Sequence, residues 1–268
     1  MLTFNIKYDT PLEELKKIRK VNDEANRIID EVTHPNMTDF EKELALHDYI
    51  VKTVEYDKSV LDSNELKKYI PENHSPYGPI ILHKGVCEGY AKAMFVLLNK
   101  AGVQCEVVVG EGINSLGKSL GKGGHAWNIV KLDGEWYNLD VTWDDPGVNI
   151  DDSISYVYFN LTDEEIKRDH IRDERSLKEY PQCKGTKYSF INMSPDTNVK
   201  VSNKEELRKV LYDIVKNKKE IINIRFEGLK ITMDELDKET WKIDGFPMKS
   251  SSYYMDGGYV KSIEYKFY

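Results

Sequence analysis

The N-terminal part of the chain alternates apolar and polar positions with helical spacing. Residues 11–32 open on Pro11 and predict one amphipathic helix. Its apolar face consists of Leu12, Leu15, Ile18, Ala25, Ile28, Ile29 and Val32. Residues 38–54 begin with a capping box at Thr38–Glu41 and predict a second helix. His47 falls within the apolar stripe of that helix, which favours a buried core histidine over a catalytic one.

A third helical pattern follows directly after Cys87 and ends near Lys100. Pro79, Gly85 and Gly89 make the approach irregular, so Cys87 is expected within one residue of the helix N-terminus. Unpaired N–H groups and the positive end of the helix dipole favour a thiolate there, and the same groups could hold an oxyanion. The alternative is a small buried cysteine at the start of a core helix.

Two strand-like segments, joined by the turn residues Asp133-Gly134, predict a β-hairpin that runs from His125 to Thr142. With a two-residue turn, His125 faces Thr142. Trp127 faces Asp140 in the same way, so these side chains share one face of the sheet. His125 and Asp140 are then diagonal neighbours, about 7 Å apart between backbones. A carboxylate in that position would fix the imidazole tautomer while the other ring nitrogen faces a thiol. A single β-bulge in the hairpin would place His125 and Asp140 on opposite faces of the sheet.

The chain reads GVCEGYAKAMFVLL around the cysteine and GGHAWNIVKLDGEWYNLDVTWDDP through the hairpin. Over about residues 41–146 these motifs resemble the transglutaminase-like superfamily, bacterial branch. The resemblance implies an α+β, papain-like fold, in which a helix bearing the cysteine packs on an antiparallel sheet. It also implies that Cys87 is the nucleophile, His125 the general base and acid, and Asp140 the orienting carboxylate.

The resemblance extends to further positions of the candidate cleft. The matching residues are Tyr90, Trp127, Trp143 and Asp144. Upstream of the cysteine, Tyr77 is the candidate oxyanion partner, and the alternative for it is a packed loop aromatic.

The segments around these motifs predict loops and two further strands. Residues 56–84 are polar and turn-rich, and predict a long connection with one short helix. Residues 110–124 are rich in glycine but lack the spaced GxxxxGK[ST] phosphate-loop pattern, so a mobile hairpin arm beside the cleft is expected. Residues 1–9 alternate like a short strand. Residues 104–109 predict a core strand in which Cys105 has a packing role.

The predicted organisation changes near residue 188. Before it, residues 155–161 predict a strand, Thr162 caps a short helix, and residues 170–187 are irregular. After it, short strands, two helices and a hairpin predict a small α+β module. We therefore expect a transglutaminase-like catalytic domain over 1–187 and an accessory domain over 188–268. Structural support is the preferred role of the accessory domain, and substrate or partner binding through exposed tyrosines is the alternative.

Composition and charge exclude several classes of protein. The 268 residues are 40% hydrophobic and 31% charged, as in an ordinary soluble globular protein. A net charge of −8 argues against a nucleic-acid partner, and no apolar run reaches the roughly 18 residues of a membrane span. The first residues lack a basic region and an apolar core, so no signal peptide is expected. The compartment stays open between the cytoplasm and a piece of a longer secreted or cell-surface protein.

The cysteines and histidines show no ligand pattern. Three cysteines, an odd count, give no disulfide framework. The sequence contains no CxxC, HExxH or acidic calcium-loop pattern, so neither a metal site nor a cofactor is expected. The remaining histidines, His34, His74, His83 and His170, lie in polar or turn contexts without ligand spacing.

These motifs together predict a thiol-dependent acyl-transfer enzyme that acts on protein or peptide amide bonds. Resolution of the thioester by water gives a cysteine peptidase or amidase, which is the favoured interpretation. Resolution by a lysine gives a cross-linking transglutaminase. A non-catalytic binding module on the same fold is a further alternative, although such relatives usually lose a triad member and all three candidates are present here. The oligomeric state stays open.

Overall fold

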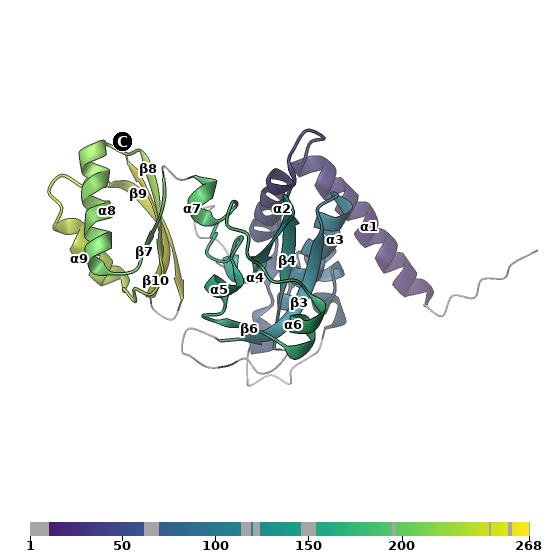
Figure 1. Cartoon of the computed structure of the whole chain (residues 1–268). Helices are drawn as coiled ribbons and strands as arrows, with labels where there is room; N and C mark the ends of the chain where they lie inside the picture. The colour runs from purple at the N-terminus through teal and green to yellow at the C-terminus, as the bar shows by residue number, and fades with distance from the viewer. Residues whose placement is uncertain are drawn as a thin grey trace, which may run out of the picture.

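The computed structural model describes residues 11–61, 70–113, 119, 124–145, 154–194, 197–246, 248–256 and 259–267. Within these residues the chain forms two four-stranded sheets, each packed against helices and each with its own hydrophobic core (Figure 1). The strand expected at residues 1–9 lies outside the described residues, as does most of the arm expected at 110–124. No helix in the described ranges combines the length and the apolar character needed to cross a membrane.

The three predicted N-terminal helices are present. Helix α1 spans Leu12–Val32, α2 spans Asp39–Thr53 and α3 spans Cys87–Lys100. The capping box of α2 is formed, because the Thr38 side chain accepts the Glu41 N–H and the Glu41 carboxylate accepts the Thr38 N–H. The buried faces of the three helices share one core, which includes Ile28, Leu46, Ile50, Met94 and Leu97.

The N-terminal sheet has the strand order β5-β4-β3-β6 and is antiparallel throughout. Its strands are β3 Cys105–Gly112, β4 His125–Leu132, β5 Glu135–Leu139 and β6 His170–Arg172. Helix α3 packs on β3 and β4, so the helix that begins with Cys87 lies against the antiparallel sheet (Figure 1). This arrangement confirms the predicted α+β fold.

The β4–β5 hairpin has the predicted register, with Leu132 opposite Glu135. The prediction that its second strand continues to Thr142 is wrong. Strand β5 ends before Asp140, whose side chain caps the short helix α4, Val141–Asp144, and so turns the chain out of the sheet. The cross-strand pairs expected beyond β5 are therefore not formed.

The connection before Cys87 contains more regular structure than the one short helix predicted. The two-residue strands β1 Glu55–Tyr56 and β2 Lys84–Gly85 pair in parallel. Short helical turns occupy η1 Lys58–Leu61, η2 Pro71–His74 and η3 Gly78–Leu82. The connection lies tightly against the start of α3, since a Cβ atom at Gly89 would lie 2.3 Å from the Asn73 carbonyl oxygen.

The segment after α4 also departs from prediction. Residues 155–161 form turns rather than a strand, and only Leu161 makes a bridge, to Asn138. The short helix capped by Thr162 is present as α5, Asp163–Ile166. The stretch predicted as irregular contains β6 and the helix α6, Glu174–Glu179.

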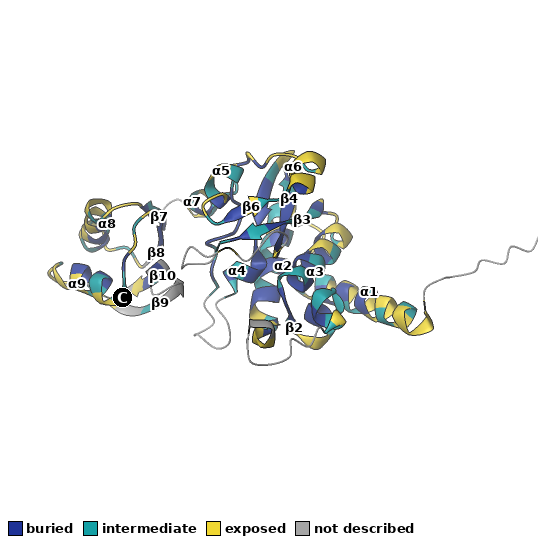
Figure 2. Cartoon of the chain, turned by 90° about the horizontal axis from the view of Figure 1, so that it is seen from below, coloured by how far each residue is buried: buried dark blue, intermediate teal, exposed yellow. Residues whose placement is uncertain are grey.

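The rest of the chain forms the predicted small α+β arrangement. Its sheet has the order β7-β8-β10-β9. The elements are α7 Phe190–Met193, β7 Asn198–Val201, α8 Lys204–Asn217, β8 Ile221–Phe226, α9 Met233–Trp241, β9 Met248–Asp256 and β10 Tyr259–Phe267. Its buried positions form a separate cluster (Figure 2). The division of the chain into two domains near residue 188, and the role of the second, stay predictions.

Candidate active site

Cys87 is the first residue of α3, as predicted, and its side chain is half-buried. The preceding residue, Val86, is the N-cap and offers no side-chain hydrogen bond to the helix. The N–H groups of the first turn of a helix have no partner within that helix. The Cys87 sulfur therefore lies at the end of α3 where a negative charge is stabilised, with part of its surface accessible.

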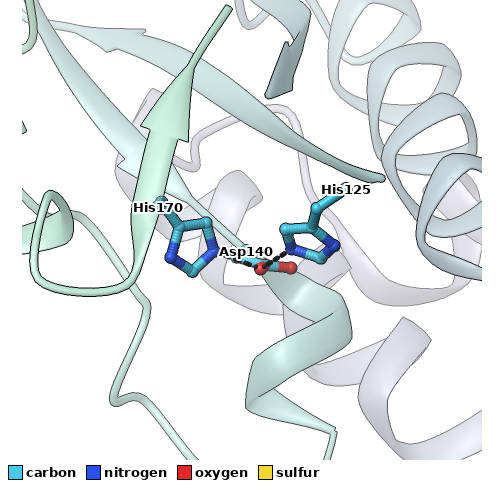
Figure 3. Close-up of side chains that lie close together, drawn as sticks. All are labelled: His125, Asp140 and His170. Carbon is cyan, nitrogen blue, oxygen red and sulfur yellow. Dashed lines mark hydrogen bonds and ion pairs between the residues drawn. The ribbon is translucent and has the colours of Figure 1, made fainter. Parts of the chain in front are cut away.

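His125 and Asp140 meet as the sequence predicts, although by a different backbone route. The His125 Nε2 atom lies 2.6 Å from Asp140 Oδ2, and both side chains are buried (Figure 3). The other carboxylate oxygen, Oδ1, accepts the N–H groups of Thr142 and Trp143 at 3.0 and 3.2 Å. Cys87 also interacts with the His125 imidazole, because its hydrogen bonding and charge contribute to the raised pKa of His125.

The charges at this site stabilise one another. Burial lowers the pKa of His125, but the charge and hydrogen bond of Asp140 and the contact with Cys87 outweigh it and raise the pKa to about 10. Burial alone would raise the pKa of Asp140, but the His125 charge and the hydrogen bonds from His125 and His170 hold it well below its usual range. His125 is therefore an imidazolium at neutral pH and Asp140 a carboxylate.

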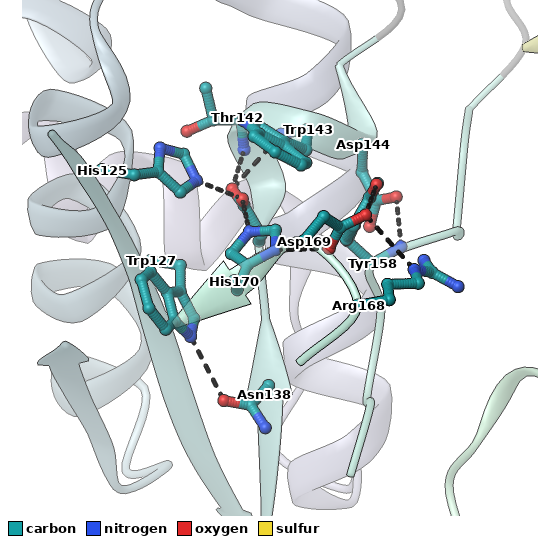
Figure 4. A network of polar contacts seen from close by, with 11 residues as sticks. His125, Trp127, Asn138, Thr142, Trp143, Asp144, Tyr158, Arg168, Asp169 and His170 are labelled. Atoms are coloured by element: carbon teal, nitrogen blue, oxygen red, sulfur yellow. Dashed lines mark hydrogen bonds and ion pairs between the residues drawn. The ribbon is translucent and has the colours of Figure 1, made fainter. Parts of the chain in front are cut away.

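His170 is the residue that sequence reasoning missed. Its Nε2 atom lies 2.8 Å from the same Asp140 Oδ2, and its Nδ1 atom lies 2.7 Å from Asp169 Oδ1 (Figures 3 and 4). The prediction of a polar or turn context is wrong, because the His170 side chain is fully buried at the start of β6. A strand of three residues is too short to show a period, so no local pattern in the sequence marks this position.

Two tryptophans lie against the histidine pair, and their role as cleft residues stays a prediction. Trp127 stacks beside His125 with 5.8 Å between ring centroids, and Trp143 lies 5.0 Å from His125. The same rings lie 5.0 and 4.4 Å from His170. The Trp127 Nε1 atom donates to Asn138 Oδ1 at 3.2 Å (Figure 4). These apolar surfaces exclude water from the hydrogen bonds at Asp140.

Comparison with known proteins shows the family to which part of the chain belongs. Residues 26–141 match the family model of the transglutaminase-like superfamily. These residues belong to that superfamily. The match contains all three candidate catalytic residues, and it confirms the family predicted from the sequence motifs. Assignment to the bacterial branch stays a prediction.

The individual relatives are similar over part of their length. Kyphoscoliosis peptidase of Mus musculus is 30% identical over 122 residues, which are 44% of this chain. The chain spans only 18% of that curated relative. Among solved structures, a TGase shares 20% identity and a TM-score of 0.40 over 51% of this chain and 34% of that chain. A candidate cysteine protease from Cytophaga hutchinsonii shares 18% identity and a TM-score of 0.33 over 50% and 43%.

The two predicted tyrosines of this transglutaminase-like core occupy different positions. Tyr90 is fully buried, and its hydroxyl donates to Asp145 Oδ2 at 2.7 Å, which ties α3 to the end of α4. Tyr77 lies on the side of α3 that faces α1, with the Lys17 Nζ atom 5.6 Å from its ring centroid. This position fits the packed aromatic that was the alternative for Tyr77.

Tyr56 is an aromatic residue that interacts electrostatically with Cys87 and Asp140. It belongs to β1, which pairs with β2 directly before α3, and it lies opposite Gly85. Burial raises the pKa of its hydroxyl, and the charges of Cys87 and Asp140 raise it further. The Tyr56 hydroxyl is therefore held as a neutral donor close to the site.

One group of described side chains has the composition of a metal site. The ligand atoms of His125, Asp140 and His170 lie within 4.8 Å of one another. Their nitrogen–oxygen separations of 2.6 and 2.8 Å are hydrogen-bond lengths, and the second ring nitrogen of His170 lies 2.7 Å from Asp169 Oδ1. We interpret the group as a hydrogen-bonded network, and the expectation of no metal stays a prediction.

Thiol labelling tests the placement of the three cysteines. Cys105 and Cys183 are buried, and burial raises the pKa of both thiols, to about 12 for Cys183. We expect iodoacetamide at neutral pH to modify Cys87 at least about tenfold faster than the other two, because thiolate character and access control the rate. Peptide mass spectrometry measures the site, with urea-unfolded protein as the control in which all three react. Equal labelling of Cys105 or Cys183 in the native protein would contradict this placement.

The raised pKa of His125 predicts a pH-dependent stability. An unfolded imidazole titrates near 6.5 and folded His125 near 10, so the folded state binds more protons between these values. The stabilisation is complete below about pH 6.5 and is lost as pH rises through about 10. Urea unfolding of wild type should lose on the order of 5 kcal/mol more across this window than His125→Gln does. The exposed His34→Gln variant should follow wild type, and parallel curves for wild type and His125→Gln would show that the pKa is not raised.

Proposed function

We propose that this transglutaminase-like protein is a thiol-dependent acyl-transfer enzyme that acts on protein or peptide amide bonds, with hydrolysis as the favoured outcome. One observation carries the proposal: His125 makes a 2.6 Å hydrogen bond to Asp140, and Cys87, at the start of α3, interacts with the same imidazole and helps to raise its pKa. A thiol, a base and an orienting carboxylate in this order constitute an activated nucleophile.

In the proposed mechanism, the Cys87 thiolate attacks the amide carbonyl carbon. The carbonyl becomes an oxyanion, which the N–H groups at the start of α3 stabilise. His125, protonated before the reaction, donates its Nδ1 proton to the leaving amine as the C–N bond breaks. A thioester on Cys87 results. Water then attacks the thioester, His125 accepts the proton from that water, and the acid product leaves.

The protein or peptide class of substrate rests on the family and on one relative. Kyphoscoliosis peptidase carries the word peptidase in its name, and its matched part includes 44% of this chain. The match covers only 18% of that relative, so the substrates of that protein are not assigned to this chain. Transamidation differs from hydrolysis only in the acceptor, an amine in place of water, and the same first half-reaction serves both.

A peptide-library digest tests the activity and separates the acceptors. We expect wild-type protein to generate new peptide termini, read by mass spectrometry, and to add a supplied primary amine at few or none of those sites. Cys87→Ala should reduce product at least about 10⁴-fold, as loss of a catalytic nucleophile does in hydrolases. Amine adducts as the main product would favour a transglutaminase. No product that depends on Cys87, from folded protein, would favour the binding-module alternative.

The two tyrosines upstream of Cys87 give opposite expectations. If the Tyr56 hydroxyl donates to the oxyanion, Tyr56→Phe should lower kcat about 100-fold on the best peptide with little change in KM. Tyr77→Phe serves as the matched control, and it should leave kcat within about twofold because its ring packs beside Lys17. A large loss of kcat in Tyr77→Phe, with no loss in Tyr56→Phe, would favour Tyr77 as the residue that donates to the oxyanion.

A further inference from the structure

The mechanism above leaves one buried titratable side chain at the site unused. His170 and His125 approach Asp140 from opposite sides, and both donate to the same oxygen, Oδ2, at 2.8 and 2.6 Å (Figure 3). The two imidazole rings lie 5.1 Å apart between centroids. A carboxylate that serves one histidine needs no second histidine on the same oxygen, so the presence of His170 calls for an explanation.

Hydrogen-bond geometry fixes the charge of His170. Its two ring nitrogens face Asp140 Oδ2 and Asp169 Oδ1. Hydrogen bonds and opposite charges hold the pKa of both carboxyl groups below the ordinary value, so both are ionised at neutral pH. An ionised carboxylate can only accept, and both nitrogens of His170 must therefore donate. With an acceptor at each ring nitrogen, the geometry points to a doubly protonated ring at His170.

The outer carboxylate is itself held in place. Asp169 Oδ2 accepts the Tyr158 hydroxyl at 2.7 Å and the Arg168 Nε at 3.3 Å (Figure 4). The charged or titratable groups around His170 are thus Asp140 from the N-cap of α4, Asp169 beside it, Tyr158, Arg168 and, across Asp140, His125 of β4. Around His125 they are Asp140, His170 and Cys87 of α3.

We propose that His170 is a positioning residue for the candidate triad: it holds the Asp140 carboxylate in place and shares its negative charge with His125. The proposal deepens the proposed function and rests on it. It assigns His170 no contact with substrate.

Sharing of the Asp140 charge between two histidines changes the pKa of His125 in a definite direction. A carboxylate that belonged to His125 alone would stabilise the His125 imidazolium more strongly, and the nearby positive charge of His170 opposes that stabilisation. His170 therefore lowers the pKa of His125 relative to an unshared pair. His125 then releases its proton to the leaving amine more readily, while Asp140 still orients its ring.

Two substitutions of His170 distinguish the effect of its hydrogen bond to Asp140 from the effect of its positive charge. His170→Gln keeps an N–H donor near the position of Nε2 but removes the positive charge. His170→Phe removes both donors and retains a ring against the two tryptophans. His34→Gln is the matched control, because His34 is exposed and distant in sequence. The readouts are the ¹⁵N NMR titration of His125 and the rate at which iodoacetamide alkylates Cys87, and neither needs a known substrate.

We expect the His125 titration in His170→Gln to move up by about one pH unit, with Cys87 alkylation close to wild type. In His170→Phe, alkylation should fall about tenfold, as it does when the residue that orients a functional side chain is lost. If His170→Phe fails to fold, His170→Asn, too short to reach Asp140, takes its place. A folded His170→Gln with an unshifted titration would overturn charge sharing, and wild-type alkylation in the variant without a donor would overturn positioning.

Failure of the proposed function gives a different pattern. In that case wild-type protein would yield no product that depends on Cys87, and Cys87→Ser would leave the His125 titration unchanged. The comparison of His125 between wild type and His170→Gln would still decide whether the two histidines share Asp140.

Discussion

The Asp140 carboxylate makes four hydrogen bonds, and the structure around the candidate site depends on all of them. Through Oδ1 it accepts the N–H groups of Thr142 and Trp143, which ends β5 and begins α4. Through Oδ2 it accepts from His125 and His170. A buried carboxylate is costly unless charge and hydrogen bonds satisfy it, and here both oxygens are satisfied. The same group therefore determines the backbone turn and the orientation of the imidazole.

Helix α4 joins this network to a second one. Asp144, at its last position, lies 3.3 Å from His47 Nε2 and accepts the Tyr158 N–H at 2.8 Å. His47 is fully buried in α2 and its Nδ1 atom lies 3.0 Å from Asp48, so it has partners on both sides. A helix of four residues has little stability of its own. Buried polar contacts at both ends fix α4 between α2 and the sheet, and they fix the place of Asp140 with it.

Much of this arrangement could be read from the sequence, because local rules agreed with the fold. Apolar spacing and the glycines around Cys87 located the start of α3, and the Asp133-Gly134 turn fixed the hairpin register. The route to Asp140 was wrong for a physical reason. The alternating residues before Thr142 resemble a strand, but an aspartate side chain that caps a helix competes with strand pairing and prevails here.

The position of His170 could not be predicted, because it depends on tertiary structure alone. The residue lies 30 positions from Asp140, in a strand that exists only by pairing with β3. Tyr77, whose oxyanion role stays a prediction, illustrates a related limit. It precedes the cysteine more closely in sequence, yet the parallel pairing of β1 with β2 brings the more distant Tyr56 to the site. Proximity along the chain is a poor guide wherever a loop packs back on a helix N-terminus.

The buried charges at the site also balance one another. In the proposed arrangement, His125 and His170 carry positive charge and Asp140 and Asp169 carry negative charge, so this inner group is neutral in sum. Neutrality matters here, because Trp127 and Trp143 cover the rings and water cannot screen an excess charge. With Asp140 and His125 alone, the pair would also be neutral, but all of the carboxylate charge would bind the proton of His125. Adding His170 and Asp169 keeps the net charge of the group at zero. It also weakens the electrostatic stabilisation of the protonated form of His125.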